Sequence, residues 1–136
     1  MRPEDSILPL EWLEVAKKDW LRMRLLLEHG DAGAAGYFLQ QSLEKYLKAF
    51  LLGRGWKLRK IHELDALLDF AVEYNPGLEA FRDLCERVSG YYSAERYPPL
   101  QGDKSTGEDI AREAREAEKL IEVLVGKPGE NHLQGR

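Results

Sequence analysis

Apolar residues recur every three or four positions along most of the chain, and this spacing constrains the fold more than any other feature. The first such stripe consists of Leu13, Ala16, Trp20, Met23 and Leu27. Glycines and prolines interrupt the spacing at intervals, and no segment alternates polar and apolar residues between hairpin turns. The sequence therefore predicts an all-α protein, an antiparallel up-and-down bundle of four main helices plus a shorter helix.

Prolines, glycines and capping residues predict where these helices begin and end. The first helix starts near Pro9 and ends at Gly30, and Asp31 is placed to cap a second helix over about residues 32–52. The buried face predicted for this second helix is Leu39, Leu43, Tyr46, Leu47, Phe50 and Leu51. We expect the third helix to begin near His62.

The second half of the chain contains two strong interruptions. Asn75-Pro76-Gly77 predicts a turn before a fourth helix whose stripe is Leu78, Phe81, Cys85, Val88 and Tyr92. Residues 93–107 contain Pro98 and Pro99 and cannot be helical throughout. Ser105 and Glu108 have the spacing of a capping box for the last helix. We predict one helical domain over residues 1–126 and a flexible C-terminal tail over 127–136.

Composition excludes several classes of function. The apolar fraction of 43% and the charged fraction of 32% are typical of a soluble globular protein. No apolar run reaches the roughly 20 residues that span a bilayer, and the N-terminus does not resemble a signal peptide. A single cysteine agrees with the reducing cytoplasm. We therefore expect a cytoplasmic protein without membrane contact, and the net charge of −4 argues against broad binding of duplex DNA.

The sequence offers little for metal or thiol chemistry. His29, His62 and His132 are far apart and have no spacing typical of a ligand set, so we expect no metal. Cys85 lies on an apolar stripe, which favours core packing over a reactive thiol. We expect no cofactor.

Three polar segments carry more information. Gln41, Lys45 and Lys48 are spaced i, i+4, i+7 and predict one polar ridge on the second helix; the alternative is a solvated face with a Glu44–Lys48 ion pair. His62 stands at a helix start, where it can cap or bond a neighbouring segment. Arg96-Tyr97-Pro98 offers a guanidinium for phosphate and a ring for stacking, or else a salt bridge that holds a loop.

The order of these segments resembles a HEPN domain (higher eukaryotes and prokaryotes nucleotide-binding). The resemblance extends from about Leu10 to Val125. The segments that carry it are 16–20 (Ala-Lys-Lys-Asp-Trp), 40–49 (Gln-Gln-Ser-Leu-Glu-Lys-Tyr-Leu-Lys-Ala), His62-Glu63-Leu64, Tyr91-Tyr92 and Arg96-Tyr97-Pro98. It implies a cytoplasmic homodimer that binds nucleotide or RNA and works with a minimal nucleotidyltransferase partner, in a toxin–antitoxin pair.

The ribonuclease branch of this family has an arginine, four to six residues and then a histidine near the start of a late helix. Arg24 and His29 have this spacing but lie at the end of the first predicted helix. After Arg82 and Arg87 the next histidine is His132, in the tail. The motif is therefore missing from its expected place, and the sequence leaves enzymatic activity undecided.

Three hypotheses follow from the sequence. In the first, a HEPN-like module binds nucleotide or RNA phosphate through Gln41, Lys45, Lys48 and Arg96, His62 orients the site, and Tyr92 or Tyr97 stacks on a base or positions a hydroxyl. In the second, the protein is a metal-independent ribonuclease toxin with a displaced site of His62, Arg96 and Tyr97. In the third, it is a structural dimerisation or docking domain. Its interface anchors would be Trp12, Trp56, Tyr91 and Tyr92.

Overall fold

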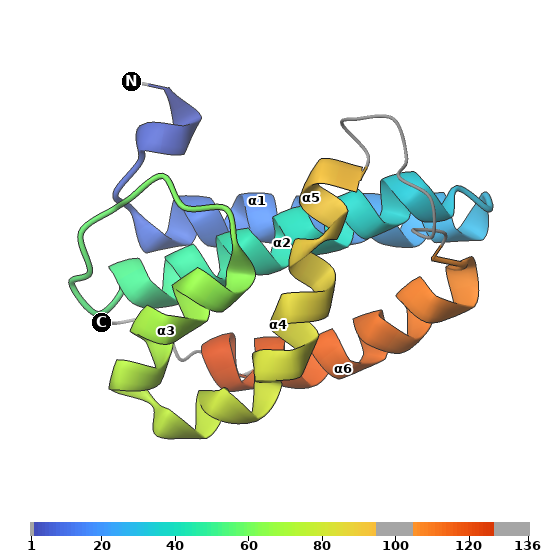
Figure 1. Cartoon of the computed structure of the whole chain (residues 1–136). Helices are drawn as coiled ribbons and strands as arrows, with labels where there is room; N and C mark the ends of the chain where they lie inside the picture. The colour runs from blue at the N-terminus through green and yellow to red at the C-terminus, as the bar shows by residue number, and fades with distance from the viewer. Residues whose placement is uncertain (1, 95–104, 127–136) are drawn as a thin grey trace.

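The computed structural model describes residues 2–94 and 105–126 of the chain. Within them the regular elements are all helical: η1 (Pro3–Asp5), α1 (Pro9–Glu28), α2 (Ala32–Leu52), α3 (Leu64–Tyr74), η2 (Pro76–Phe81), α4 (Arg82–Ser89), α5 (Tyr91–Ala94) and α6 (Gly107–Val125). Figure 1 shows α1 and α2 lying side by side as a long pair, with α3, α4 and α6 packed on the other side of α2. The predicted all-α bundle is confirmed.

The boundary between α1 and α2 follows the sequence closely. Pro9 is the first residue of α1, where its missing N–H costs no helical hydrogen bond. Gly30 follows the helix with a positive φ of 80°, a conformation that suits glycine. The Asp31 side chain accepts a hydrogen bond of 3.1 Å from the Ala34 N–H and so caps α2. These residues reverse the chain, and α1 and α2 become an antiparallel pair.

Helix α2 is the central element of the bundle, because it contacts α1, α3, α4, α5 and α6. Its predicted apolar face is buried as expected: Leu39, Leu43, Tyr46, Leu47, Phe50 and Leu51. Surrounded on most sides, α2 also buries Gln40, Ser42, Glu44 and Lys48. Polar groups placed on this helix must therefore find partners inside the protein.

The third and fourth predicted helices differ from the structure at their ends. Helix α3 begins at Leu64 with Glu63 as its N-cap, so His62 belongs to the preceding connector. The predicted fourth helix is divided into η2, α4 and α5. The Asn75 side chain accepts from the Gly77 N–H and starts a tight 3₁₀ turn, and Gly90, a poor helix former, stands at the second break.

The cap of α6 is one residue beyond the predicted position. Thr106 and Asp109 form the capping box, with each side chain bonded to the backbone N–H of the other. The predicted pair, Ser105 and Glu108, has the same spacing of three residues. The Ser105 hydroxyl does not cap the helix and accepts a hydrogen bond from the Tyr91 hydroxyl. In the part of the chain that the structure describes, no helix combines the length and apolar character needed to span a membrane.

Candidate functional site

A pocket of about 830 Å³ lies between the N-terminal segment, α1, the middle of α2 and the connector before α3. Its walls include three residues predicted from the α2 pattern, Gln41, Lys45 and Lys48, together with His62 from the connector. Six lysine or arginine side chains and four glutamates line it: Arg2, Lys18, Lys45, Lys48, Arg59, Lys60, Glu4, Glu11, Glu14 and Glu44. The structure thus brings predicted site residues 41, 45, 48 and 62 together.

The buried carboxylate of Glu44 is the centre of this site. It accepts hydrogen bonds from Gln40 Nε2 at 3.2 Å and from Lys48 Nζ at 2.9 Å. The Nδ1 atom of His62 lies 3.3 Å from Glu44 Oε2. Glu44 therefore fixes three neighbouring polar side chains at once.

The prediction that Lys48 lies off the buried face of the second helix is wrong. The residue is only 3% exposed, its ammonium group pairs with Glu44, and it lies 5.1 Å from the centre of the Trp12 ring. The physical reason is the central position of α2, because α1 packs along it and places Trp12 over Lys48. The Glu44–Lys48 pair predicted as the alternative does form, but inside the protein.

Lys45 keeps partial access to the pocket. Its side chain is 18% exposed, and its ammonium group contacts Asp19 Oδ2 and Gln41 Oε1. Asp19 also accepts from Arg22 at 2.6 Å, so one carboxylate is shared by two cations. Gln41 in turn donates to Gln40 at 2.8 Å. The cluster therefore retains an excess of positive charge beside the pocket.

Asp19 is a site residue that the sequence interpretation missed. It is 2% exposed, and the buried residues of α1 are Trp12, Ala16, Asp19 and Met23. Their spacing of four, three and four positions is itself a helical stripe, and an acidic residue within it signals a buried partner of opposite charge.

His62 joins the pocket to an aromatic cluster. Its ring stacks on Tyr92, with centroids 4.8 Å apart and an interplanar angle of 12°. Its backbone carbonyl accepts a hydrogen bond of 2.8 Å from Gln40 Nε2. Tyr92 is therefore next to the site through His62. The predicted residues Arg96 and Tyr97, with Pro98, lie outside the described residues, as does the predicted tail of residues 127–136.

The proposed interface anchors occupy different environments. Trp12 is 6% exposed, and its indole N–H donates to the Ser6 carbonyl at 2.7 Å, so it is a core residue and not an exposed anchor. Trp56 is partly buried and packs against Phe70. Tyr91 is partly buried against the core.

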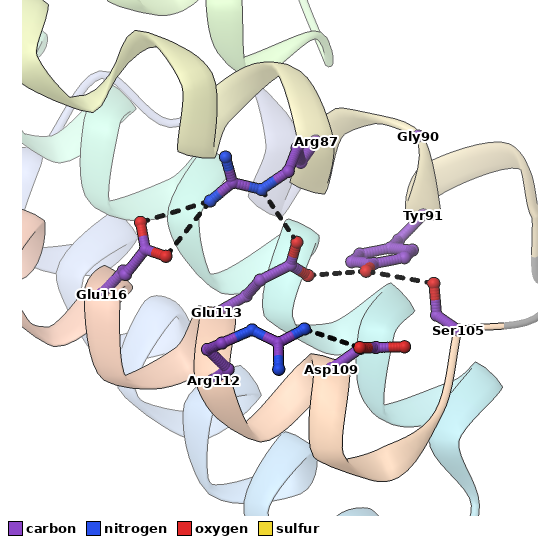
Figure 2. A pocket seen from close by; sticks show the side chains of 8 residues that line it. All are labelled: Arg87, Gly90, Tyr91, Ser105, Asp109, Arg112, Glu113 and Glu116. Carbon is purple, nitrogen blue, oxygen red and sulfur yellow. Dashed lines mark hydrogen bonds and ion pairs between the residues drawn. The ribbon is translucent and has the colours of Figure 1, made fainter.

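A second, smaller pocket of about 460 Å³ lies between α4, α5 and α6 (Figure 2). Its central residue is the buried Glu113, which accepts from the Tyr91 hydroxyl and from Arg87 Nε, the latter at 3.1 Å. Burial, together with the hydrogen bond to Glu113, raises the pKa of Tyr91 to about 12. Arg87 also contacts Glu116, and Arg112 contacts Asp109. These groups satisfy one another, which is typical of a structural clamp between helices.

Neither Cys85 nor a metal-binding cluster adds a second reactive site to the described residues. Burial raises the pKa of Cys85 to about 12, so the thiol stays protonated at neutral pH and packs as a small apolar side chain, as the sequence indicates. Within residues 2–94 and 105–126, no three histidine, cysteine or acidic side chains are grouped so that they could hold a metal ion.

Comparison with known proteins gives a family for this architecture. The family model described as "HEPN domain" matches residues 10–127 of the 136-residue chain. No curated protein matches the chain, and no solved structure matches it.

Proposed function

Because the chain belongs to the HEPN domain family, we propose that the pocket around Lys45 and His62 binds the phosphate of a nucleotide or of RNA. The observation that carries this proposal is the convergence of Gln41, Lys45, Lys48 and His62, from two separate segments, on one pocket.

Of the two lysines predicted on α2, Lys45 is the better placed for direct contact with phosphate. It reaches the pocket surface, whereas Lys48 is enclosed by Glu44 and Trp12. Lys45 shares Asp19 with Arg22, and a phosphate group would complete the neutralisation of this pair. Lys48 then acts indirectly, because it holds Glu44 in the position that orients His62.

Isothermal titration with AMP tests this assignment, using wild type, Lys45→Gln and the control Lys17→Gln. Lys17 is exposed on α1 and is not among the residues that line the pocket. Loss of a charge-assisted contact in Lys45→Gln is expected to weaken binding about tenfold or more, while Lys17→Gln binds like wild type. Asp19 keeps Arg22 as a partner in the Lys45 variant, so the fold should persist. Equal affinities for all three proteins would remove Lys45 from the site.

The same proposal extends to assembly: a cytoplasmic homodimer that works with a minimal nucleotidyltransferase in a toxin–antitoxin pair. Leu21 and Leu25 support an interface, since they lie one turn apart on α1 and are 57% and 47% exposed. Exposed apolar groups of this kind are typical of docking surfaces. Sedimentation of the wild type and of Leu21→Asp, together with co-purification of a minimal nucleotidyltransferase, tests this part. A monomeric wild type that retains no partner would contradict it.

A second candidate function is RNA cleavage, and the Glu44–His62 contact favours it. A carboxylate on Nδ1 orients an imidazole so that Nε2 can accept a proton. The proton would come from a 2′-hydroxyl, whose oxygen would attack the adjacent phosphorus and form a 2′,3′-cyclic phosphate. The P–O5′ bond would break, and the proton held on His62 Nε2 would return to the departing 5′-oxygen. Incubation with cellular RNA should show cleavage that His29→Ala retains and His62→Ala loses. Intact RNA with the wild type, or cleavage that persists in His62→Ala, would dismiss this candidate.

A further inference from the structure

Three aromatic rings from separate elements form a series that ends at the pocket. Tyr37 of α2 stacks on Tyr92 of α5, with centroids 6.3 Å apart and an interplanar angle of 29°. Tyr92 stacks on His62 of the connector at 4.8 Å and 12°. His62 is the member of this series that lines the pocket.

The exposure of these rings decides which of them can meet a ligand. Tyr92 already has two aromatic neighbours, and it is not among the residues that line the pocket. His62 has Tyr92 against one face, yet its side chain is 46% exposed. Trp12 also lines the pocket, but it is only 6% exposed and Lys48 lies 5.1 Å from its ring centre. The ring face that His62 turns away from Tyr92 is therefore the more accessible aromatic surface at the pocket.

The orientation of His62 is fixed before any ligand arrives. Its Nδ1 lies 3.3 Å from Glu44 Oε2, and its carbonyl accepts from Gln40. Glu44 and Gln40 are both buried, and they bond to each other. The His62 ring is thus held at its Nδ1 edge, through its backbone and on one face. It loses little conformational entropy when another ring stacks on it, which favours binding.

We propose that this outward face of His62 is the stacking surface for a nucleobase, so that the pocket selects a nucleotide over a bare phosphate or a sugar phosphate. This inference rests on the proposed phosphate site at Lys45. The base would stack on His62 at one wall while the phosphate meets the Lys45 side of the same pocket, whose volume lies within the ordinary range for small-molecule sites. It assigns to His62 the stacking role predicted for Tyr92 or Tyr97, and Tyr92 becomes the ring that supports His62.

The test compares AMP with ribose 5-phosphate, which shares the phosphate and ribose but lacks the base. Titrations use the full chain as wild type, His62→Ala, His62→Phe and the control His29→Ala. His29 is exposed at the end of α1 and does not line the pocket. Glu44 keeps Gln40 and Lys48 as partners in both His62 variants, so a folded protein is expected.

We expect the wild type and His29→Ala to bind AMP about tenfold more tightly than ribose 5-phosphate, because stacking of one base on an aromatic side chain is worth about that factor or more. His62→Ala should lose this preference and keep its affinity for ribose 5-phosphate, whereas His62→Phe should retain the preference. In NMR spectra of the wild type, the adenine protons should shift upfield on binding, which supports stacking even if a variant fails to fold.

Three results distinguish failure of this inference from failure of the proposed function. Equal binding of AMP and ribose 5-phosphate by the wild type would overturn base stacking and leave the phosphate site standing. Binding of neither compound would overturn the phosphate site, and the stacking proposal with it. Equal loss of both ligands in His62→Ala would place His62 on the phosphate and so contradict its role in base selection.

Discussion

At the scale of single residues, Lys48 and Glu44 form an ion pair in the interior, with side chains 4% and 5% exposed. Removal of two charges from water costs several kcal/mol per ion, which the pair recovers only through close contact and further hydrogen bonds. Glu44 obtains those bonds from Gln40 and His62, and Lys48 obtains a contact with the Trp12 ring. The pair is therefore sensitive to the loss of either member.

We predict that Lys48→Met lowers the free energy of unfolding by about 3 kcal/mol, because Glu44 is left as a buried charge without its cation. Glu44→Gln in the same chain should restore a large part of that loss, since the double variant buries no charge at this point. Urea unfolding of the two single variants and the double variant measures the coupling. Strictly additive effects of the two substitutions would contradict the buried pair.

The sequence predicted part of this site because several of its members belong to recognisable patterns. Gln41, Lys45 and Lys48 have helical spacing in the sequence. His62 was predicted as a site residue because it stands near the predicted start of a helix. The sequence did not predict that Lys48 would be buried, because burial on α2 depends on how many neighbours pack around it. Asp19 was missed for a related reason: its partner Lys45 is 26 positions away, and no local pattern links them.

At the scale of elements, the fold could be predicted wherever residues that start or end helices stand at the ends of an apolar stripe. Pro9, Gly30 and Asp31 mark the turn between α1 and α2 correctly. The region after Asn75 was predicted as one helix because its apolar spacing is continuous, but the local preferences of the turn and of Gly90 divide it. Helix boundaries in this region depend on competition between the backbone preferences of individual residues and the burial of the apolar stripe.

Gly36 shows how closely three elements approach. A Cβ atom at this position of α2 would lie 3.1 Å from Tyr91 Cγ of α5 and 3.2 Å from Ile110 Cδ1 of α6. Both distances are shorter than ordinary contacts of a methyl group with carbon. The absence of a side chain therefore allows Tyr91 of α5 and Ile110 of α6 to pack closely against α2 at this position.

We predict that Gly36→Ala lowers the free energy of unfolding by about 1 kcal/mol. Overpacking costs about 1–3 kcal/mol, whereas alanine gains up to about 1 kcal/mol of helix propensity over glycine. The hydrogen bond from the Tyr91 hydroxyl to Glu113 restrains the ring from moving aside. The control is Gly107→Ala at the first residue of α6, where a Cβ would meet nothing within 4 Å. Thermal unfolding compares the two, and a stabilised Gly36→Ala would show that α5 shifts freely.

At the scale of the whole molecule, the distribution of charge separates a local site from a general nucleic-acid surface. The chain has a net charge of −4, yet six lysine or arginine side chains gather around the pocket with four glutamates. Net repulsion acts on a long polyanion, whereas a single phosphate experiences mainly the groups within about 10 Å of it at 0.1 M salt. This distribution of charge agrees with the proposed contact to one phosphate and argues against contacts with many phosphates along a duplex.

This distribution predicts how binding depends on salt. An increase of NaCl from about 50 to about 500 mM should weaken AMP binding only severalfold, because one phosphate releases few counterions, whereas a protein that contacts many phosphates loses several orders of magnitude. A duplex DNA of about 20 base pairs should show no shift in a native gel at about 150 mM NaCl. Titrations at four salt concentrations give the slope of the logarithm of AMP affinity against the logarithm of salt concentration. The Lys45→Gln substitution should reduce this slope if Lys45 contacts the phosphate. Tight duplex binding with a steep salt dependence would contradict the argument from net charge and point to a basic surface outside this pocket. An AMP slope that is unchanged in Lys45→Gln would remove Lys45 from contact with the phosphate.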